Sequence, residues 1–466
     1  MRIEKDSMGE IQLPDDALYG AQTARAINNF KVSGRTAHKE FIEATIIIKK
    51  AAAMVHRRLG LLSENKSEAI ISAADEILAG QYTDQFVVDV FQAGAGTSHN
   101  MNCNEVLANL ANEKLGGKRG EYNFVHPNDD VNMSQSTNDV IPSAMRLASL
   151  SLLKELYPII EKMISLLKSK AREFDKVIKS GRTHLQDAVP IRLGQEFSGY
   201  AVCIEDHLNK IKSSAVSLKQ LGIGGSAVGT GLNVHPKYGG MMVETLSKLT
   251  GENFSMAKNY FEVMQSMAPF VDLSGALRSF AVDLGRIAND IRLLSSGPKT
   301  GLSEISLPAV QPGSSIMPGK VNPVMAEMLN MVCFRVIGND LTISSAAGAG
   351  QLELNVMMPI IADTIVESLK ILAGGLNSFN NRCLGDISAD AERCRYYAEN
   401  SFAMVTALNT IIGYNKAAEV VKEAMTTGNN IKEIIIGKGY LNTEEVETYL
   451  APKNLTEPGI PGKNIS

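Results

Sequence analysis

The chain has 466 residues, of which 44% are hydrophobic and 21% charged, and its formal net charge is −4, which is typical of a soluble globular protein with two or three domains. Basic residues are interspersed with acidic ones and form no basic stripe, so nucleic acid is not expected as a partner. No apolar run reaches membrane-spanning length, so a membrane is not expected either. The N-terminus lacks a signal-peptide pattern and the five cysteines lack C-x-x-C spacing, so we expect reduced thiols and a cytoplasmic location.

The N-terminal part of the chain is predicted to be mainly helical after an initial arm. Residues 1–35 are polar and turn-rich, which suggests an extended segment. Apolar residues then recur with helical spacing over 41–62 and 66–79.

A glycine-interrupted turn, Gly94-Ala95-Gly96, enters a further predicted helix over 101–113. Thr97 and Ser98 stand where hydroxyl groups cap helix N-termini, and capping alone is one interpretation of them. The other interpretation is functional, because the unpaired N–H groups and positive dipole end of a helix can hold a carboxylate beside Thr97.

Two polar segments precede the longest predicted helix. The first is His126-Pro-Asn-Asp-Asp-Val-Asn132, and the second contains Ser136, Thr137 and Asn138, three consecutive small hydrogen-bonding residues that form another candidate anion cradle. The helix that follows, over 144–174, would be about 45 Å long, and such a length belongs in a helical bundle.

Polar residues Ser180-Gly-Arg-Thr-His-Leu-Gln-Asp-Ala188 form a third cluster, which includes Thr183 and His184. His184 alone is equally well interpreted as a core or capping histidine. The glycine-rich segment 222–231 lacks the βαβ context of a dinucleotide site. Further helices are predicted over 193–218, 264–294, 327–372, 398–412 and 415–426.

The segment Pro312-Gly-Ser-Ser-Ile-Met-Pro-Gly-Lys-Val-Asn-Pro323 cannot be helical, because glycines and prolines impose special backbone angles along it. It presents Ser314, Ser315, Lys320 and Asn322 on a shaped loop, which suggests carboxylate binding and catalysis. A Walker phosphate loop needs different spacing and a Ser or Thr after the lysine, where Val321 stands. An inert connector remains the alternative for the loop alone.

Long helices with polar loops at their ends and few strand signals predict a mainly α fold with a long central helical bundle. We place an N-terminal domain at 1–138, the bundle at 139–393 and a small C-terminal domain at 394–466. One bundle cannot easily bring polar clusters on differently directed helices to a single end, whereas association of several chains can. A homo-oligomer is therefore expected.

The polar clusters, taken together and in order, resemble the four active-site segments of the aspartase/fumarase superfamily. The matching segments are 94–98, 134–139, 181–187 and the signature loop 313–323, and the resemblance extends over the whole chain. It implies a three-domain, mostly α subunit in a homotetramer with a twenty-helix core. It also implies active sites shared between three subunits.

The resemblance further implies elimination of a group β to a carboxylate to give fumarate, or the reverse addition, acting on a small dicarboxylate with no cofactor or metal. Ser314 would be the base, with Lys320 and loop N–H groups stabilising its alkoxide. The carboxylate next to the carbanion would be held by Thr97, Ser136, Thr137 and Ser315. Lys320, Asn322, Thr183 and His184 would hold the other carboxylate, with Asn138 near the leaving group.

The identity of the leaving group stays open at this point. Segments 94–98, 136–138 and 324–325 are more like those of aspartases, which release ammonia. Segments 126–132 and 224–231 are more like those of fumarases, which release water, and the first of them suggests a second anion site at His126, Asn128 and Asp129. A structural oligomer that merely retains ancestral loops would be expected to have degraded catalytic positions, and these are all present.

Overall fold

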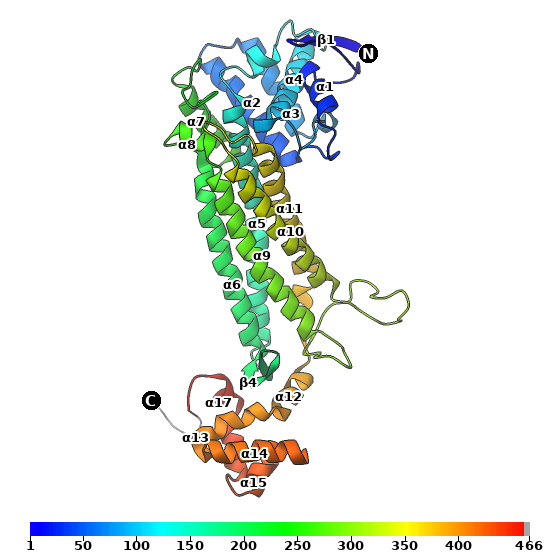
Figure 1. Cartoon of the computed structure of the whole chain (residues 1–466), viewed down its shortest axis with the longest axis vertical. Helices are drawn as coiled ribbons and strands as arrows, with labels where there is room; N and C mark the ends of the chain where they lie inside the picture. Colours follow the sequence, from blue (N-terminus) through cyan, green and yellow to red (C-terminus); the bar gives the residue numbers. More distant parts are fainter. Residues whose placement is uncertain (461–466) are drawn as a thin grey trace. The chain divides into compact units, whose positions relative to one another are not determined.

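The computed structural model describes residues 1–460 and is mainly helical (Figure 1). The chain divides into two compact units, of which unit 1 comprises 1–158, 207–282 and 332–374. Unit 2 comprises 159–206, 283–331 and 375–466. The predicted mainly α fold is confirmed, whereas the domain boundaries predicted at 138 and 393 stay a prediction.

The first 35 residues are not the extended arm predicted from the sequence. Strands β1 (Arg2–Asp6) and β2 (Gly9–Leu13) form an antiparallel hairpin, and helix α1 (Ala21–Asn29) follows. Buried Glu105 explains the helix, because its carboxylate accepts hydrogen bonds from the backbone N–H groups of Gly20, Gln22 and Thr23 at the start of α1. Glu105 is remote in sequence, so the local pattern could not reveal this cap.

Three helices of unit 1 pack around one hydrophobic core and carry the first polar clusters. They are α2 (Lys39–Arg58), α3 (Glu64–Leu78) and α4 (Thr97–Lys114), and their shared core includes Ile46, Ile70 and Val106, all 0% exposed. Their predicted spans are confirmed to within a few residues at each end. Short turns η1 (Thr83–Gln85), η2 (Gly94–Gly96) and η3 (Pro127–Val131) connect or follow them.

The bundle consists of five long helices, parts of which lie side by side in each unit (Figure 1). Every unit boundary falls inside one of these helices, so each helix contributes to both units. Helix α5 shows why they form, since Leu153, Leu156, Ile160, Met163 and Leu167 recur at helical spacing and are completely buried. The five are α5 (Thr137–Glu173), α6 (Leu193–Ser214), α9 (Ala268–Leu294), α10 (Val324–Gly348) and α11 (Met358–Arg382).

The single helix predicted over 327–372 is wrong, because the structure has two helices, α10 and α11, with a turn at 349–357. The Asn355 side chain accounts for the break. Its amide donates to the carbonyl oxygens of Ala346 and Ala347 at the end of α10, and its own oxygen accepts from the N–H of Met357.

The remaining elements of the central region are short. All strands among residues 1–460 belong to two-stranded sheets, of which β5–β6 is parallel and the others are antiparallel. The elements are β3 (Ile178–Thr183), β4 (Gln186–Arg192), η4 (Ala215–Lys219), β5 (Gln220–Leu221), α7 (Tyr238–Thr250), β6 (Ser255–Met256), α8 (Tyr260–Gln265), β7 (Ile305–Ser306), η5 (Leu384–Asp386) and β8 (Ser388–Ala389).

The C-terminal region has its own hydrophobic core, formed by residues between Met404 and Leu450. The helix predicted over 398–412 is replaced by the 3-10 turn η6 (Phe402–Leu408) and a short α13 (Asn409–Ile412), with Ser401 capping the turn. The other helices are α12 (Ala391–Asn400), α14 (Tyr414–Thr427), α15 (Ile431–Gly437), α16 (Thr443–Tyr449) and α17 (Pro452–Thr456). Within 1–460, no helix combines the length and apolar character that crossing a membrane requires.

Candidate active site

The N-termini of α4 and α5 meet in unit 1 and bring two of the predicted clusters together. Gly96, with φ of 88°, is the residue before α4, and a Cβ there would lie 3.1 Å from Ile141 of α5, so close packing requires glycine. Asn100 Nδ2 of α4 donates to Thr137 Oγ1 of α5 over 3.3 Å. Because Gly96 occupies the cap position, Thr97 is the first residue of α4 rather than its cap, and it is exposed. The start of α4 that carries Thr97 thus packs beside the start of α5 that carries Thr137.

The start of α5 is fixed by the glycine-rich segment 222–231. Asp139 accepts hydrogen bonds from the backbone N–H groups of Gly224, Ser226 and Ser136, each over 3.0 Å. Asn138 Nδ2 donates to the carbonyl oxygen of Ala227 over 2.7 Å. The glycine-rich segment 222–231 thus holds the first turn of α5, including the predicted substrate-binding residue Asn138, through these hydrogen bonds. Burial raises the pKa of Asp139 to about 6, against the effect of these three N–H donors.

A buried polar cluster behind these helix starts was missed by sequence reasoning. Lys49 of α2 is 0% exposed, and its Nζ donates to Asn132 Oδ1 over 2.9 Å and to Gln135 Oε1 over 3.0 Å. Burial lowers the pKa of Lys49 to about 7. The available signal was a pair of lysines, Lys49 and Lys50, between Ile46-Ile47-Ile48 and an alanine run, because two adjacent residues of a helix cannot both lie on a narrow polar face.

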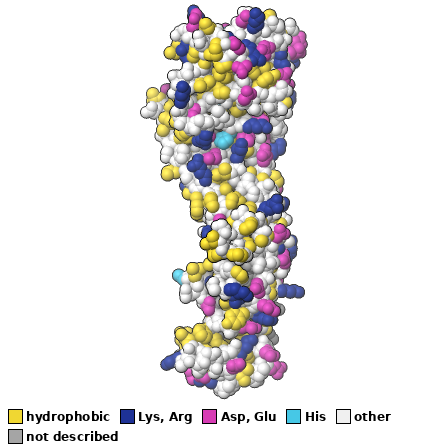
Figure 2. Space-filling model, turned by 90° about the vertical axis from the view of Figure 1, so that its right-hand side faces the viewer, with side chains coloured by type: hydrophobic (Ala, Val, Ile, Leu, Met, Phe, Trp, Pro, Cys, Tyr) yellow, Lys and Arg dark blue, Asp and Glu magenta, His cyan; other side chains and the backbone are white. Residues whose placement is uncertain are grey.

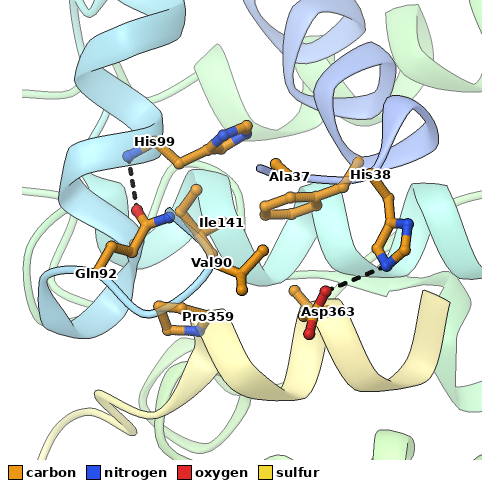
Figure 3. A pocket seen from close by; sticks show the side chains of 11 residues that line it. Ala37, His38, Val90, Gln92, His99, Ile141, Pro359 and Asp363 are labelled. Carbon is orange, nitrogen blue, oxygen red and sulfur yellow. Dashed lines mark hydrogen bonds and ion pairs between the residues drawn. The ribbon is translucent and has the colours of Figure 1, made fainter. Parts of the chain in front are cut away.

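A cavity of about 20 Å³ lies beside Gly96 in unit 1, lined by side chains that include His38, Gln92, His99 and Asp363 (Figure 3). His38 Nε2 lies 3.2 Å from Asp363 Oδ1, and Gln92 Oε1 accepts from the backbone N–H of His99. Burial and the charge of Lys49 lower the pKa of His99 to about 3, so this imidazole is neutral at neutral pH. The cavity has room for about one water molecule and is too small for a dicarboxylate.

His184 and Thr183 lie on the tip of a hairpin in unit 2. Thr183 pairs with Gln186, and the two residues between them, His184 and Leu185, have φ of 56° and 59°, which identifies a tight turn of the type I′ class. The hairpin is anchored by Glu304, whose carboxylate contacts Arg182 Nη1 at 2.8 Å and Lys179 Nζ at 2.9 Å. The tip is exposed and its base is held by these two ion pairs, which suits a residue that reaches a ligand.

The signature loop, also in unit 2, is closed by two hydrogen bonds. The backbone N–H of Gly313 donates to the carbonyl oxygen of Lys320 over 2.7 Å, and Asn322 Nδ2 donates to the carbonyl oxygen of Gly313 over 2.7 Å. Ser315 and Lys320 are exposed. Asn322 therefore shapes the loop in this structure, and its predicted contact with the substrate stays a prediction.

Two backbone N–H groups of this loop point at the Ser314 hydroxyl. Its Oγ accepts hydrogen bonds from the backbone N–H groups of Ile316 over 3.2 Å and Met317 over 3.0 Å. Donors of this kind favour the negatively charged form of the group that accepts from them. The loop thus has a local means of stabilising an alkoxide at Ser314.

The predicted site residues fall into three groups. Thr97, Ser136, Thr137 and Asn138 are gathered in unit 1, whereas the loop residues and the hairpin residues belong to unit 2. Within the described part of unit 2, no hydrogen bond or ion pair joins the loop 312–323 to Thr183 or His184.

The predicted second anion site has a defined local geometry. His126 precedes the turn η3, and its Nδ1 accepts from the backbone N–H groups of Asn128 over 3.3 Å and Asp129 over 3.2 Å. His126 Nδ1 also lies 3.4 Å from Asp129 Oδ2. The N–H groups that an anion would use are thus occupied by the histidine, and the second site stays a prediction.

Comparison with known proteins identifies the family. A family described as lyase matches residues 9–338, and a fumarase C C-terminal family matches residues 404–457. Aspartate ammonia-lyase of Bacillus subtilis is 48% identical over 464 residues, covering 100% of this chain and 98% of the relative. Class II fumarate hydratase of Halobacterium salinarum is also 48% identical, over 98% of each chain.

A solved structure gives the same result for the fold. The cobalt-bound fumarate lyase:delta crystallin of Brucella melitensis has a TM-score of 0.94 and 47% identity, covering 98% of this chain and 100% of that one. Because matches of this extent are shared with ammonia-lyases and hydratases alike, they do not distinguish the leaving group. The chain therefore belongs to the aspartase/fumarase superfamily of lyases, and the segments predicted to form its active site lie on the helix starts, hairpin and loop described above.

Proposed function

We propose that the protein is an aspartate ammonia-lyase, which removes ammonia from L-aspartate to give fumarate. The observation that carries the proposal is the arrangement at Ser314, where a hydroxyl on a loop with an exposed lysine accepts two backbone N–H hydrogen bonds. A serine needs such stabilisation to act as a base near neutral pH.

In the proposed reaction, the Ser314 alkoxide takes a proton from the carbon next to the substrate's side-chain carboxylate. The electron pair left on that carbon is delocalised into the carboxylate, which becomes a doubly charged aci-carboxylate. The pair then forms the carbon–carbon double bond while the carbon–nitrogen bond breaks and ammonia leaves with the bonding electrons. Stabilising the aci-carboxylate is the largest demand on the site.

The helix starts of α4 and α5 are suited to that demand. Thr97, Ser136 and Thr137 lie where backbone N–H groups and the positive ends of helix dipoles favour negative charge. Lys320 and the hairpin residues Thr183 and His184 would hold the second carboxylate. Asn138, fixed by Ala227, would lie near the leaving group.

The choice of ammonia over water rests on the sequence of the site segments. Residues 94–98, 136–138 and 324–325 resemble aspartases in the segments proposed to touch substrate. Hydration of fumarate to L-malate is the second candidate, and the segment His126–Asn132 favours it.

We expect the purified protein to convert L-aspartate to fumarate with a much higher kcat/KM than L-malate. The site segments that resemble aspartases are the reason for this expectation. Fumarate absorbs in the ultraviolet, so its formation from each substrate can be followed directly. A higher kcat/KM for malate would identify the hydratase instead, and no fumarate from either substrate would refute both candidates.

We also propose that the active site is completed by association of chains into a homotetramer. Helix α10 supports this, because Met331, Phe334 and Leu341 share one face of the helix and are 66%, 65% and 70% exposed in the single chain. Figure 2 shows hydrophobic side chains at the surface among the charged ones. An apolar helix face of this kind is normally covered by another helix.

The tetramer should be the active species, and dissociated chains should lack activity, because each site would need residues from several subunits. Sedimentation analysis combined with assays over a range of protein concentrations tests this. A single chain with full specific activity would contradict the shared site.

A further inference from the structure

Lys49 is a buried cation whose hydrogen-bond partners are neutral. Its ammonium group donates to the side-chain oxygens of Asn132 and Gln135, and neither partner is a carboxylate. Burying a charge in this way is costly unless the surroundings compensate for it. An apolar residue at position 49 would avoid that cost, so we expect Lys49 to have a role beyond packing.

A continuous series of hydrogen bonds runs from Lys49 to the proposed carboxylate site. Asn132 Oδ1 accepts from Lys49 Nζ over 2.9 Å and from Asn100 Nδ2 over 3.3 Å. The same Asn100 Nδ2 donates to Thr137 Oγ1 over 3.3 Å. Because a carboxamide nitrogen carries two hydrogens, Asn100 can make both bonds at once.

The last bond of the series determines what the Thr137 hydroxyl can do. Asn100 is the only hydrogen-bond partner of the Thr137 side chain within residues 1–460, and it occupies a lone pair of the oxygen. The hydroxyl proton is therefore left for an acceptor. A substrate carboxylate at the start of α5 is such an acceptor.

The turn between η3 and α5 is folded around the lysine. Gln135 binds Lys49 through Oε1, and its Nε2 donates to the carbonyl oxygens of Val131 and Met133. Asn132 Nδ2 donates to the carbonyl oxygen of Gln135 over 3.2 Å. Loss of the ammonium would therefore release the two amide oxygens that hold this turn against α2.

We infer that Lys49 and Asn100 are positioning residues for the substrate carboxylate, because they hold the 132–135 turn and orient the Thr137 hydroxyl as a donor. The inference rests on the proposed function only in placing a dicarboxylate at Thr137. It does not depend on whether ammonia or water is the leaving group. Neither residue itself contacts the substrate.

The test is a double-mutant cycle on fumarate binding, measured by calorimetry with the assembled protein. Lys49→Met and Thr137→Val should each raise the Kd for fumarate, by about tenfold, as expected for loss of one charge-assisted hydrogen bond. If Lys49 acts through Thr137, the double variant should bind about as weakly as Thr137→Val alone. If the two single increases in Kd instead multiply in the double variant, Lys49 acts independently of Thr137 in a merely structural role. That result would overturn the inference.

Asn100→Ala supplies a second cycle that leaves Lys49 and its two partners intact, and it serves if Lys49→Met does not fold. Asn100→Ala alone should weaken fumarate binding. In a chain that already carries Thr137→Val, it should change the Kd little. Ser67→Ala is the matched control, because it removes a buried hydrogen bond, to the carbonyl oxygen of Ala53, from the same core. It should lower the melting temperature without changing the Kd.

The pH dependence gives an independent readout. Cys103 and His99 face Lys49 but are uncharged near neutral pH, whereas Asp139 is the titratable group whose negative charge favours the ammonium form. With a pKa of about 7, Lys49 loses its proton as pH rises through neutrality. Fumarate binding should weaken over that range, and Lys49→Met should remove this part of the dependence. An unchanged pH profile in Lys49→Met would contradict the inference.

The outcomes separate this inference from the proposed function. Turnover of L-aspartate tests the ammonia-lyase proposal, whereas the binding cycle uses fumarate, which both candidate reactions share. If the natural chain binds fumarate but the substitutions at Lys49 and Thr137 have additive effects on the binding free energy, the role of Lys49 is refuted. The lyase proposal is then left intact. No fumarate binding by the natural chain would refute both.

Discussion

Ser314→Ala should reduce kcat by orders of magnitude while the protein still folds and assembles. The side chain is partly exposed on a loop and contributes to no hydrophobic core, so its loss should change the free energy of unfolding by no more than about 0.5 kcal/mol. If the hydroxyl is the base, its removal affects the transition state and leaves substrate binding nearly unchanged. Measuring kcat, substrate Kd and the melting curve together tests all three expectations.

Lys320→Ala is the informative comparison for Ser314→Ala. Lys320 is proposed to bind a substrate carboxylate as well as to stabilise the alkoxide, so its loss should raise the substrate Kd in addition to lowering kcat. A folded Ser314→Ala protein with nearly normal kcat would remove Ser314 from the mechanism. His184 would then become the candidate base.

Gly313→Ala should reduce kcat/KM by about 100-fold, because it displaces the loop that carries Ser314 and Lys320. A Cβ at this position would lie 2.5 Å from the carbonyl oxygen of Lys320 and 2.8 Å from the backbone nitrogen of Asn322. Both contacts are with backbone atoms, so only a shift of the loop can relieve them. Steady-state kinetics with a melting curve separates this effect from unfolding.

Gly319→Ala is the matched variant in the same loop. Gly319 has φ of +80°, which strains other residues by roughly 1 kcal/mol, but a Cβ there would contact nothing within 4 Å. It should therefore retain much more activity than Gly313→Ala. Equal losses in the two variants would mean that loop closure at Gly313 has no special role.

The sequence predicted the long helices well because their burial pattern is strong and local. Leu153, Leu156, Ile160 and Leu167 repeat with helical spacing, and the structure buries them all. The break between α10 and α11 was missed because apolar residues continue across it. It depends on one side chain, Asn355, that caps the end of α10, and the local signals were Gly348, Gly350 and Pro359.

Within the candidate site, the exposed polar residues on loops and helix starts were recognisable, whereas the buried ones were not. Ser314 and His184 stand in distinctive polar motifs. Lys49, Asn100 and Asn132 belong to different segments, and their relation exists only once α2, α4 and the turn before α5 are packed together. In the sequence alone, Lys49 and Asn100 are indistinguishable from polar surface positions of two separate helices, and Asn132 from a loop residue.

The continuity of the long helices across both units restricts how this protein could be rearranged. Because every unit boundary falls within a helix, no cut at a boundary yields an intact segment at either side. Neither unit is a contiguous cassette that recombination could transfer to another gene. Such a chain can change its chemistry more readily by single substitutions at the helix starts, where Thr97, Thr137 and Val324 lie, than by exchange of whole units.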